Sequence, residues 1–76
     1  MEEKLRIEIS TKLDSSAKYM LESMTNEELS LEELYEWFGY IRAIRDVAFE
    51  IGIMSYTNTH EYVEQALKIL RERNNI

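Results

Sequence analysis

The chain has 76 residues, which suffices for one domain at most, and we expect residues 1–76 to form a single helical domain. It has no cysteine and one histidine, which excludes a disulfide framework and any metal site built from thiolates or several histidines. Fifteen acidic and nine basic residues give a formal net charge of −6, so the chain is a poor generic binder of nucleic acid, whose phosphates attract basic proteins.

The chain contains no proline and two glycines, a composition that favours long helices. No apolar run approaches the ~20 residues that span a bilayer, and the acidic start leads into no signal-like apolar stretch. We therefore expect a cytoplasmic protein with no membrane segment.

The first predicted element is a helix over residues 2–24. Its apolar residues form a stripe with i, i+4 spacing, made of Leu5, Ile9, Leu13, Ala17, Met20, Leu21 and Met24. Residues 4–10 allow a second interpretation, because Leu5, Ile7 and Ile9 alternate with polar residues at the period of a strand. A short N-terminal strand at residues 4–10 therefore stays open.

The central segment predicts a helix over residues 31–52. Ser30 and Glu33 have the spacing of a capping box, and Gly52 is a suitable C-terminal stop. One continuous apolar arc contains Leu34, Trp37, Phe38, Ile41, Ile44, Val47, Ala48 and Ile51. This arc is wider than the ~100° stripe of a one-sided surface helix. The helix therefore requires two neighbours, from the same chain or from a second copy.

The last predicted helix covers residues 59–73 and is amphipathic, with cations in its final turns. Together these elements predict an all-α, three-helix domain. Because so small a chain has a wide apolar arc and surplus aromatic residues, we also expect a homodimer. The residues expected to be buried are Leu34, Phe38, Ile41, Ile44, Ala48, Leu67 and Leu70.

Groups that could support catalysis are sparse. His60 lies near Ser55, Thr57 and Thr59, but residues so close in sequence belong to one turn, and we expect an exposed helix residue. Glu32 and Glu36 share a helix face, yet the histidines that a di-iron site needs are absent. There is no phosphate-binding loop and no serine elbow. We therefore expect no enzyme, no cofactor and no metal.

The acidic block is the most informative feature. Between Tyr19 and Ile41 there are six glutamates and no lysine or arginine. Glutamates in the first turn of a helix complement its dipole, which accounts for part of this block. We predict that the remainder binds a basic surface of a partner protein. The predicted binding residues are Glu27, Glu28, Glu32, Glu33, Tyr35 and Glu36, with Tyr35 as an aromatic anchor.

Two functions fit these observations. The first is a non-enzymatic regulator, antitoxin-like protein or inhibitor that binds a basic protein surface and could mimic nucleic acid. The second depends on residues 4–10 forming a strand, since the order strand, helix, helix resembles a ribbon-helix-helix DNA-binding regulator. That resemblance covers about the first 45 residues and implies that Arg6 and Glu8 face the bases. The chain lacks the glycine common in that family's interhelical turn.

Overall fold

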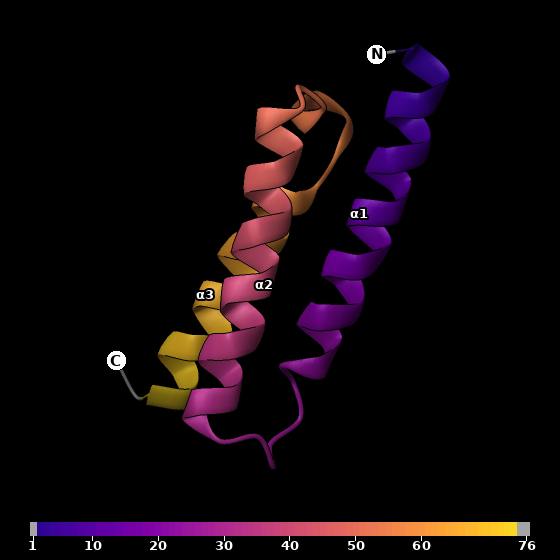
Figure 1. The fold of residues 1–76 in the computed structure, drawn as a ribbon. Helices are drawn as coiled ribbons and strands as arrows, with labels where there is room; N and C mark the ends of the chain where they lie inside the picture. The colour runs from indigo at the N-terminus through magenta and orange to yellow at the C-terminus, as the bar shows by residue number, and fades with distance from the viewer. Residues whose placement is uncertain (1, 75–76) are drawn as a thin grey trace.

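The computed structural model describes residues 2–74 and contains three helices (Figure 1). Helix α1 covers Glu3–Ser23, α2 covers Leu31–Glu50, and α3 covers Thr59–Asn74; a short 3₁₀ helix, η1, covers Met54–Tyr56. The predicted all-helical, three-helix architecture is confirmed, and each helix begins and ends within two residues of its expected bounds.

The sequence allowed either a helix or a strand at residues 4–10. In the structure these residues lie inside α1 and are helical. The stripe in α1 continues without a break: Ser10, Ala17 and Met24 are buried at intervals of seven residues. Ser10 can lie in the interior because its hydroxyl donates a hydrogen bond of 2.8 Å to the carbonyl of Ile7.

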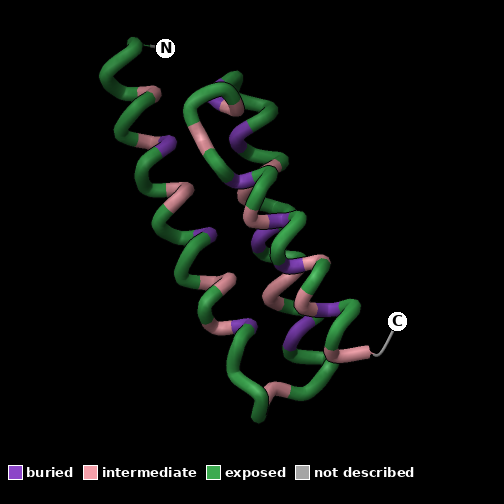
Figure 2. Tube along the Cα trace, turned by 180° about the vertical axis from the view of Figure 1, so that it is seen from behind, coloured by how far each residue is buried: buried purple, intermediate pink, exposed green. Residues whose placement is uncertain are grey.

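The same seven-residue spacing recurs in the other helices. In α2 the buried residues are Leu34, Ile41 and Ala48; in α3 two such series alternate, Thr59 with Ala66 and Val63 with Leu70. Figure 2 shows that the buried positions of α1 recur along the side that faces the other helices. Such spacing keeps one seam of each helix in contact with its neighbours at a small crossing angle, as in helical bundles.

Helix α2 packs against both other helices, which explains most of its wide apolar arc, although Val47 and Ile51 of that arc stay exposed. The central cluster contains Met24, Leu34, Ile41, Val63, Ala66 and Leu70. Of the residues expected in the core, Leu34, Ile41, Ala48 and Leu70 are buried. The prediction is wrong for Phe38, Ile44 and Leu67, which are only half-buried. A bundle measuring 18 by 15 Å in cross-section has room for one buried line per helix, and these three side chains lie beside that line.

The end of α2 has the geometry that Gly52 suggested. Gly52 has φ +75°, in the left-handed region that glycine tolerates best. Its N–H bonds to Phe49 O at 3.1 Å, and the N–H of Ile53 bonds to Ala48 O at 2.9 Å, which together make a Schellman motif. The motif places Ile53 in the interior, fully buried beside Ala48.

Helix α1 is held to the segment between α2 and α3 by polar contacts. Arg6 Nη1 donates to the carbonyl of Gly52 at 3.3 Å. Eight residues further along α1, Asp14 Oδ1 accepts the backbone N–H of Asn58 at 2.8 Å. These contacts join segments more than forty residues apart and hold α1 against the connection between α2 and α3.

Candidate protein-binding site

The predicted binding glutamates gather at the end of the molecule where α1 passes into α2. We call Glu27, Glu28, Glu32, Glu33 and Glu36 the acidic connection. Glu27 and Glu28 lie in the turn between the helices, and the other three lie in the first two turns of α2 (Figure 1). All five are exposed. The fold therefore brings the predicted carboxylates to one end of the bundle.

One of these glutamates has a structural role. Glu33 N–H donates to the Ser30 hydroxyl oxygen at 3.1 Å, and Glu33 Oε1 accepts the backbone N–H of Ser30 at 3.4 Å. This is the capping box that the sequence predicted, and it defines the beginning of α2. Glu33 still contributes charge to the surface, but its carboxylate accepts hydrogen bonds from Ser30 as part of the cap.

The other four carboxylates have no partner among the described residues. Within residues 2–74, the side chains of Glu27, Glu28, Glu32 and Glu36 form no hydrogen bond and no ion pair. Glu32 and Glu36 lie one turn apart on the side of α2 opposite its buried line. Four exposed, unpaired carboxylates at one end make a strongly negative surface.

Hydrogen bonds hold the backbone that carries these charges. The Leu29 N–H bonds to Asn26 O at 3.2 Å, and Asn26 Oδ1 accepts the N–H of Glu28 at 3.0 Å. Such turns, in which an asparagine side chain replaces a backbone acceptor, hold short connections in one conformation. The charges of the acidic connection are therefore presented on a defined turn.

A cation from the far end of the sequence also holds this turn, and sequence reasoning missed it. Arg73, in the last turn of α3, donates from Nη1 to Asn26 O at 3.4 Å and from Nη2 to the carbonyl of Leu29. The acidic block has no lysine or arginine in sequence, yet the fold places this guanidinium against its backbone. The basic last turn of α3 was the available signal, but nothing in the sequence indicated its partner.

Tyr35 lies at the edge between α2 and α3. Its hydroxyl oxygen accepts a hydrogen bond of 3.0 Å from Asn74 Nδ2, and the residue is 53% exposed. The polar end of this side chain is thus engaged within the chain. The part of Tyr35 that is available for contact with a partner is therefore its exposed ring.

A second exposed surface combines aromatic side chains of α1 and α2. Trp37 makes edge-on contacts with Tyr19, at 6.3 Å between ring centroids, and with Tyr40, at 6.0 Å. Tyr19 is 65% exposed and Tyr40 is 54% exposed. Val47 and Ile51 continue the row on the same side of α2 and are also exposed. We call these five residues the aromatic face.

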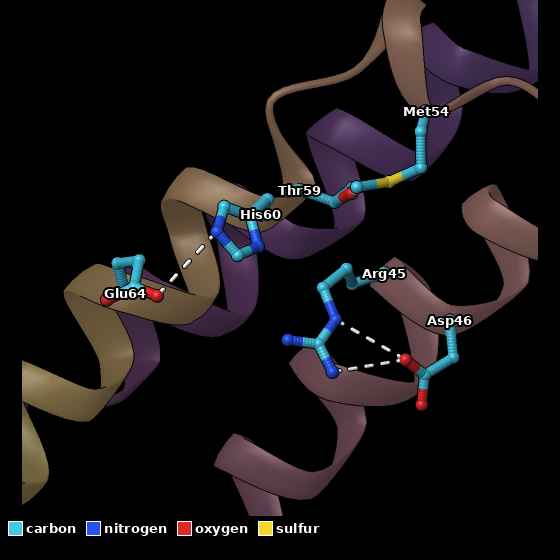
Figure 3. Close-up of polar contacts among 6 residues, drawn as sticks. All are labelled: Arg45, Asp46, Met54, Thr59, His60 and Glu64. Atoms are coloured by element: carbon cyan, nitrogen blue, oxygen red, sulfur yellow. Dashed lines mark hydrogen bonds and ion pairs between the residues drawn. The ribbon is translucent and has the colours of Figure 1, made fainter.

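His60 lies on the outside of α3, as the sequence predicted (Figure 3). Its Nε2 is 3.7 Å from Glu64 Oε1, and both side chains are more than half exposed. Thr59, its neighbour, is buried, and its hydroxyl lies 3.8 Å from Met54 Sδ and 3.0 Å from Thr57 Oγ1. The threonine hydroxyls therefore bond to interior groups, away from the imidazole.

Among residues 2–74, no group of three or more histidine, cysteine, aspartate or glutamate side chains is arranged to hold a metal ion. None of the helices formed by these residues is both long and apolar enough to cross a bilayer. Comparison of the chain with known protein families, characterised proteins and solved structures finds no match.

Proposed function

We propose that the protein is a non-enzymatic interaction protein that binds a basic surface of another protein through the acidic connection. The observation that carries this proposal is the set of four exposed carboxylates without an intramolecular partner, on Glu27, Glu28, Glu32 and Glu36. Like charges this close repel one another, and a basic partner relieves that repulsion. The negative end would also steer a basic partner into encounter and so raise the association rate.

The order of the connection supports the same function. Ser30 and Glu33 fix the start of α2, and Arg73 fixes the turn before it. A surface that is already ordered loses less conformational entropy on binding than a flexible acidic tail would. The charges of the acidic connection can therefore contribute affinity without a preceding folding step.

This function includes regulators, antitoxin-like proteins and inhibitors. A row of carboxylates that occupies a groove made for phosphates would block nucleic acid by mimicking its charge. The ribbon-helix-helix alternative requires a strand at residues 4–10, and those residues are helical here. Arg6, which that alternative places on the bases, instead donates to the Gly52 carbonyl. We therefore favour a protein partner over DNA.

We also propose that two copies associate through the aromatic face. Tyr19, Tyr40 and Val47 expose apolar area on one side of the α1–α2 pair, and Trp37 connects the two helices beneath it. Clustered aromatic area of this kind is typical of interfaces. Two-fold pairing is the simplest arrangement for a single self-complementary face.

The test of partner binding begins with capture of the partner on the immobilised full chain. Binding is then titrated at several salt concentrations with the double variant Glu32→Lys, Glu36→Lys. We expect at least tenfold weaker binding and a shallower salt dependence, because exposed charges act within a Debye length of ~8 Å. The matched control is Glu50→Lys, Glu61→Lys, which makes the same charge change at exposed positions outside the acidic connection.

The control variant should keep the affinity of the original chain. Undiminished affinity and an unchanged salt slope in the Glu32→Lys, Glu36→Lys variant would contradict the proposal. Specific, salt-sensitive binding of the unmodified chain to duplex DNA would favour the alternative function instead.

A further inference from the structure

A groove runs between α1 and α3, close to the acidic connection. Its main part has a volume of about 380 Å³ and is lined by Leu21, Glu22, Thr25, Gln65, Lys68, Ile69 and Glu72. A second hollow of about 270 Å³ continues it and shares Thr25, Ile69 and Glu72 as lining residues. The second hollow adds Met24, Glu27 and Arg73. The groove therefore leads directly to the first glutamate of the acidic connection.

The position of the groove follows from how the helices pack. Helices α2 and α3 contact each other most extensively, and α1 packs less closely on both, least of all on α3. The chain runs down in α1, up in α2 and down again in α3, so α1 and α3 are parallel (Figure 1). In an up-down-up-down bundle, a fourth helix packs against the first and third helices, on the side away from the second. A fourth helix lying in the α1–α3 groove would take that position.

The chemistry of the groove suits one kind of helix. Leu21 and Ile69 are half-buried, pack against the core cluster and offer apolar contacts. Carboxylates of Glu22, Glu27 and Glu72 line the groove, against the two cations Lys68 and Arg73. Arg73 directs its guanidinium to the carbonyls of the turn. A helix with apolar side chains on one stripe and basic side chains beside it is complementary to this lining.

We propose that the α1–α3 groove binds an amphipathic, basic helix of the partner protein and so completes a four-helix bundle. Apolar side chains of that helix pack on Leu21 and Ile69, and its lysines or arginines lie beside Glu22, Glu27 and Glu72. This inference deepens the proposed function and rests on it, since both require a basic protein partner. It adds apolar contacts in the groove, on a different surface from Glu32 and Glu36.

The probe is a panel of synthetic helical peptides of about 20 residues, with leucines at i, i+3, i+4 and i+7 and lysines or arginines on both flanks. A control peptide keeps the leucines and replaces every basic residue with glutamate. Binding is followed by amide chemical shifts of the nitrogen-15-labelled full chain. We expect shifts around Leu21, Gln65 and Ile69 with the basic peptides, and none with the acidic control.

Variants locate the site without disturbing the core. Gln65→Trp fills the groove from an exposed position, and Glu72→Lys reverses a lining charge; each should weaken peptide binding at least tenfold. The matched control is Glu64→Lys, at an exposed residue of α3 that does not line the groove. Circular dichroism of each variant verifies that the helices are intact.

Each outcome decides between surfaces. Absence of shifts with every basic peptide, or equal loss in Glu64→Lys and Glu72→Lys, overturns the groove proposal. Shifts confined to the acidic connection overturn it as well, while leaving the proposed function in place. Binding at the groove that is unchanged by Glu32→Lys, Glu36→Lys supports the groove and removes those two residues from the mechanism.

Discussion

Arg73, in the last turn of α3, donates a hydrogen bond to the carbonyl of Leu29, the residue that precedes the cap of α2. The same guanidinium reaches Asn26 O at 3.4 Å. One side chain therefore joins the C-terminal end of the third helix to the connection between the first two. Because both acceptors are backbone atoms, this contact depends little on which side chains occupy the connection.

We expect Arg73→Gln to destabilise the fold by ~1–3 kcal/mol, since hydrogen bonds from charged donors contribute more than neutral ones. Arg71→Gln is the matched control, because Arg71 is exposed in the same last turn and loses the same charge. Urea unfolding of the two variants gives the comparison. Equal losses would mean that the charge near the helix end matters and that the bonds to Asn26 and Leu29 do not.

The buried line of α2 gives a second prediction. Ile41→Ala should cost ~2–5 kcal/mol, because Ile41 is fully buried in the central cluster and truncation leaves a cavity. Ile44→Ala makes the same change beside that line, at a half-buried position, and should cost under about 2 kcal/mol. Unfolding midpoints measure both. A larger loss at Ile44 than at Ile41 would mean that the two sides of α2 are assigned wrongly.

The fold was largely predictable because its local signals agree. The capping box at Ser30 and the glycine at position 52 mark the ends of α2, and apolar periodicity identifies its buried line. The burial of Phe38 and Ile44 was overestimated because a helical wheel gives direction but not depth. Depth depends on where α1 and α3 lie, and that is set by contacts such as Asp14 with Asn58, between residues 44 positions apart.

The candidate site was only partly predictable. The sequence identified the carboxylates of the acidic connection, since charge clustering is visible in a linear chain. It did not identify Arg73 as their neighbour, because that contact joins α3 to the α1–α2 connection, nor the groove between Leu21 and Ile69, which arises from packing of α1 against α3. Tyr35 was predicted as an anchor, and its bond to Asn74 depends on the packing of α2 against α3.

We expect Tyr56 to make the stability of the fold sensitive to alkaline pH. A hydrogen bond to the Glu3 carboxylate, together with the negative charge of that group, raises the pKa of the Tyr56 phenol above its usual value near 10. A raised pKa means that the folded state holds this proton more tightly than the unfolded state does. The contribution is therefore complete below about pH 10 and is lost as the pH rises through the folded pKa.

The comparison of Tyr56→Phe with the original chain isolates this contribution. At pH 8 the original chain should have the higher unfolding midpoint, and the difference should shrink or reverse above pH 11, where the tyrosinate faces Glu3. Tyr40→Phe controls for general effects of tyrosine ionisation, since Tyr40 lies on the aromatic face and not beside Glu3. A difference between Tyr56→Phe and the original chain that stays constant with pH would contradict this interpretation.

Self-association through the aromatic face is the last prediction. We expect light scattering after size exclusion to give a mass that rises from monomer to dimer with concentration in the micromolar range. The double variant Tyr40→Lys, Val47→Lys should be monomeric at every concentration, because burying two ammonium groups at an interface is strongly unfavourable. Both residues are about half exposed, so the folded monomer should tolerate the change.

Phe49→Lys is the discriminating control for this dimer. Phe49 is 72% exposed and lies on the opposite flank of α2 from Tyr40, so its replacement removes as prominent an apolar group from a different surface. If the aromatic face forms the dimer, Phe49→Lys still dimerises. If Phe49→Lys gives a monomer while Tyr40→Lys, Val47→Lys still dimerises, the interface lies on the flank of α2 near Tyr35 and α3. A mass independent of concentration in the original chain would contradict self-pairing, and the aromatic face would then require a different protein to cover it.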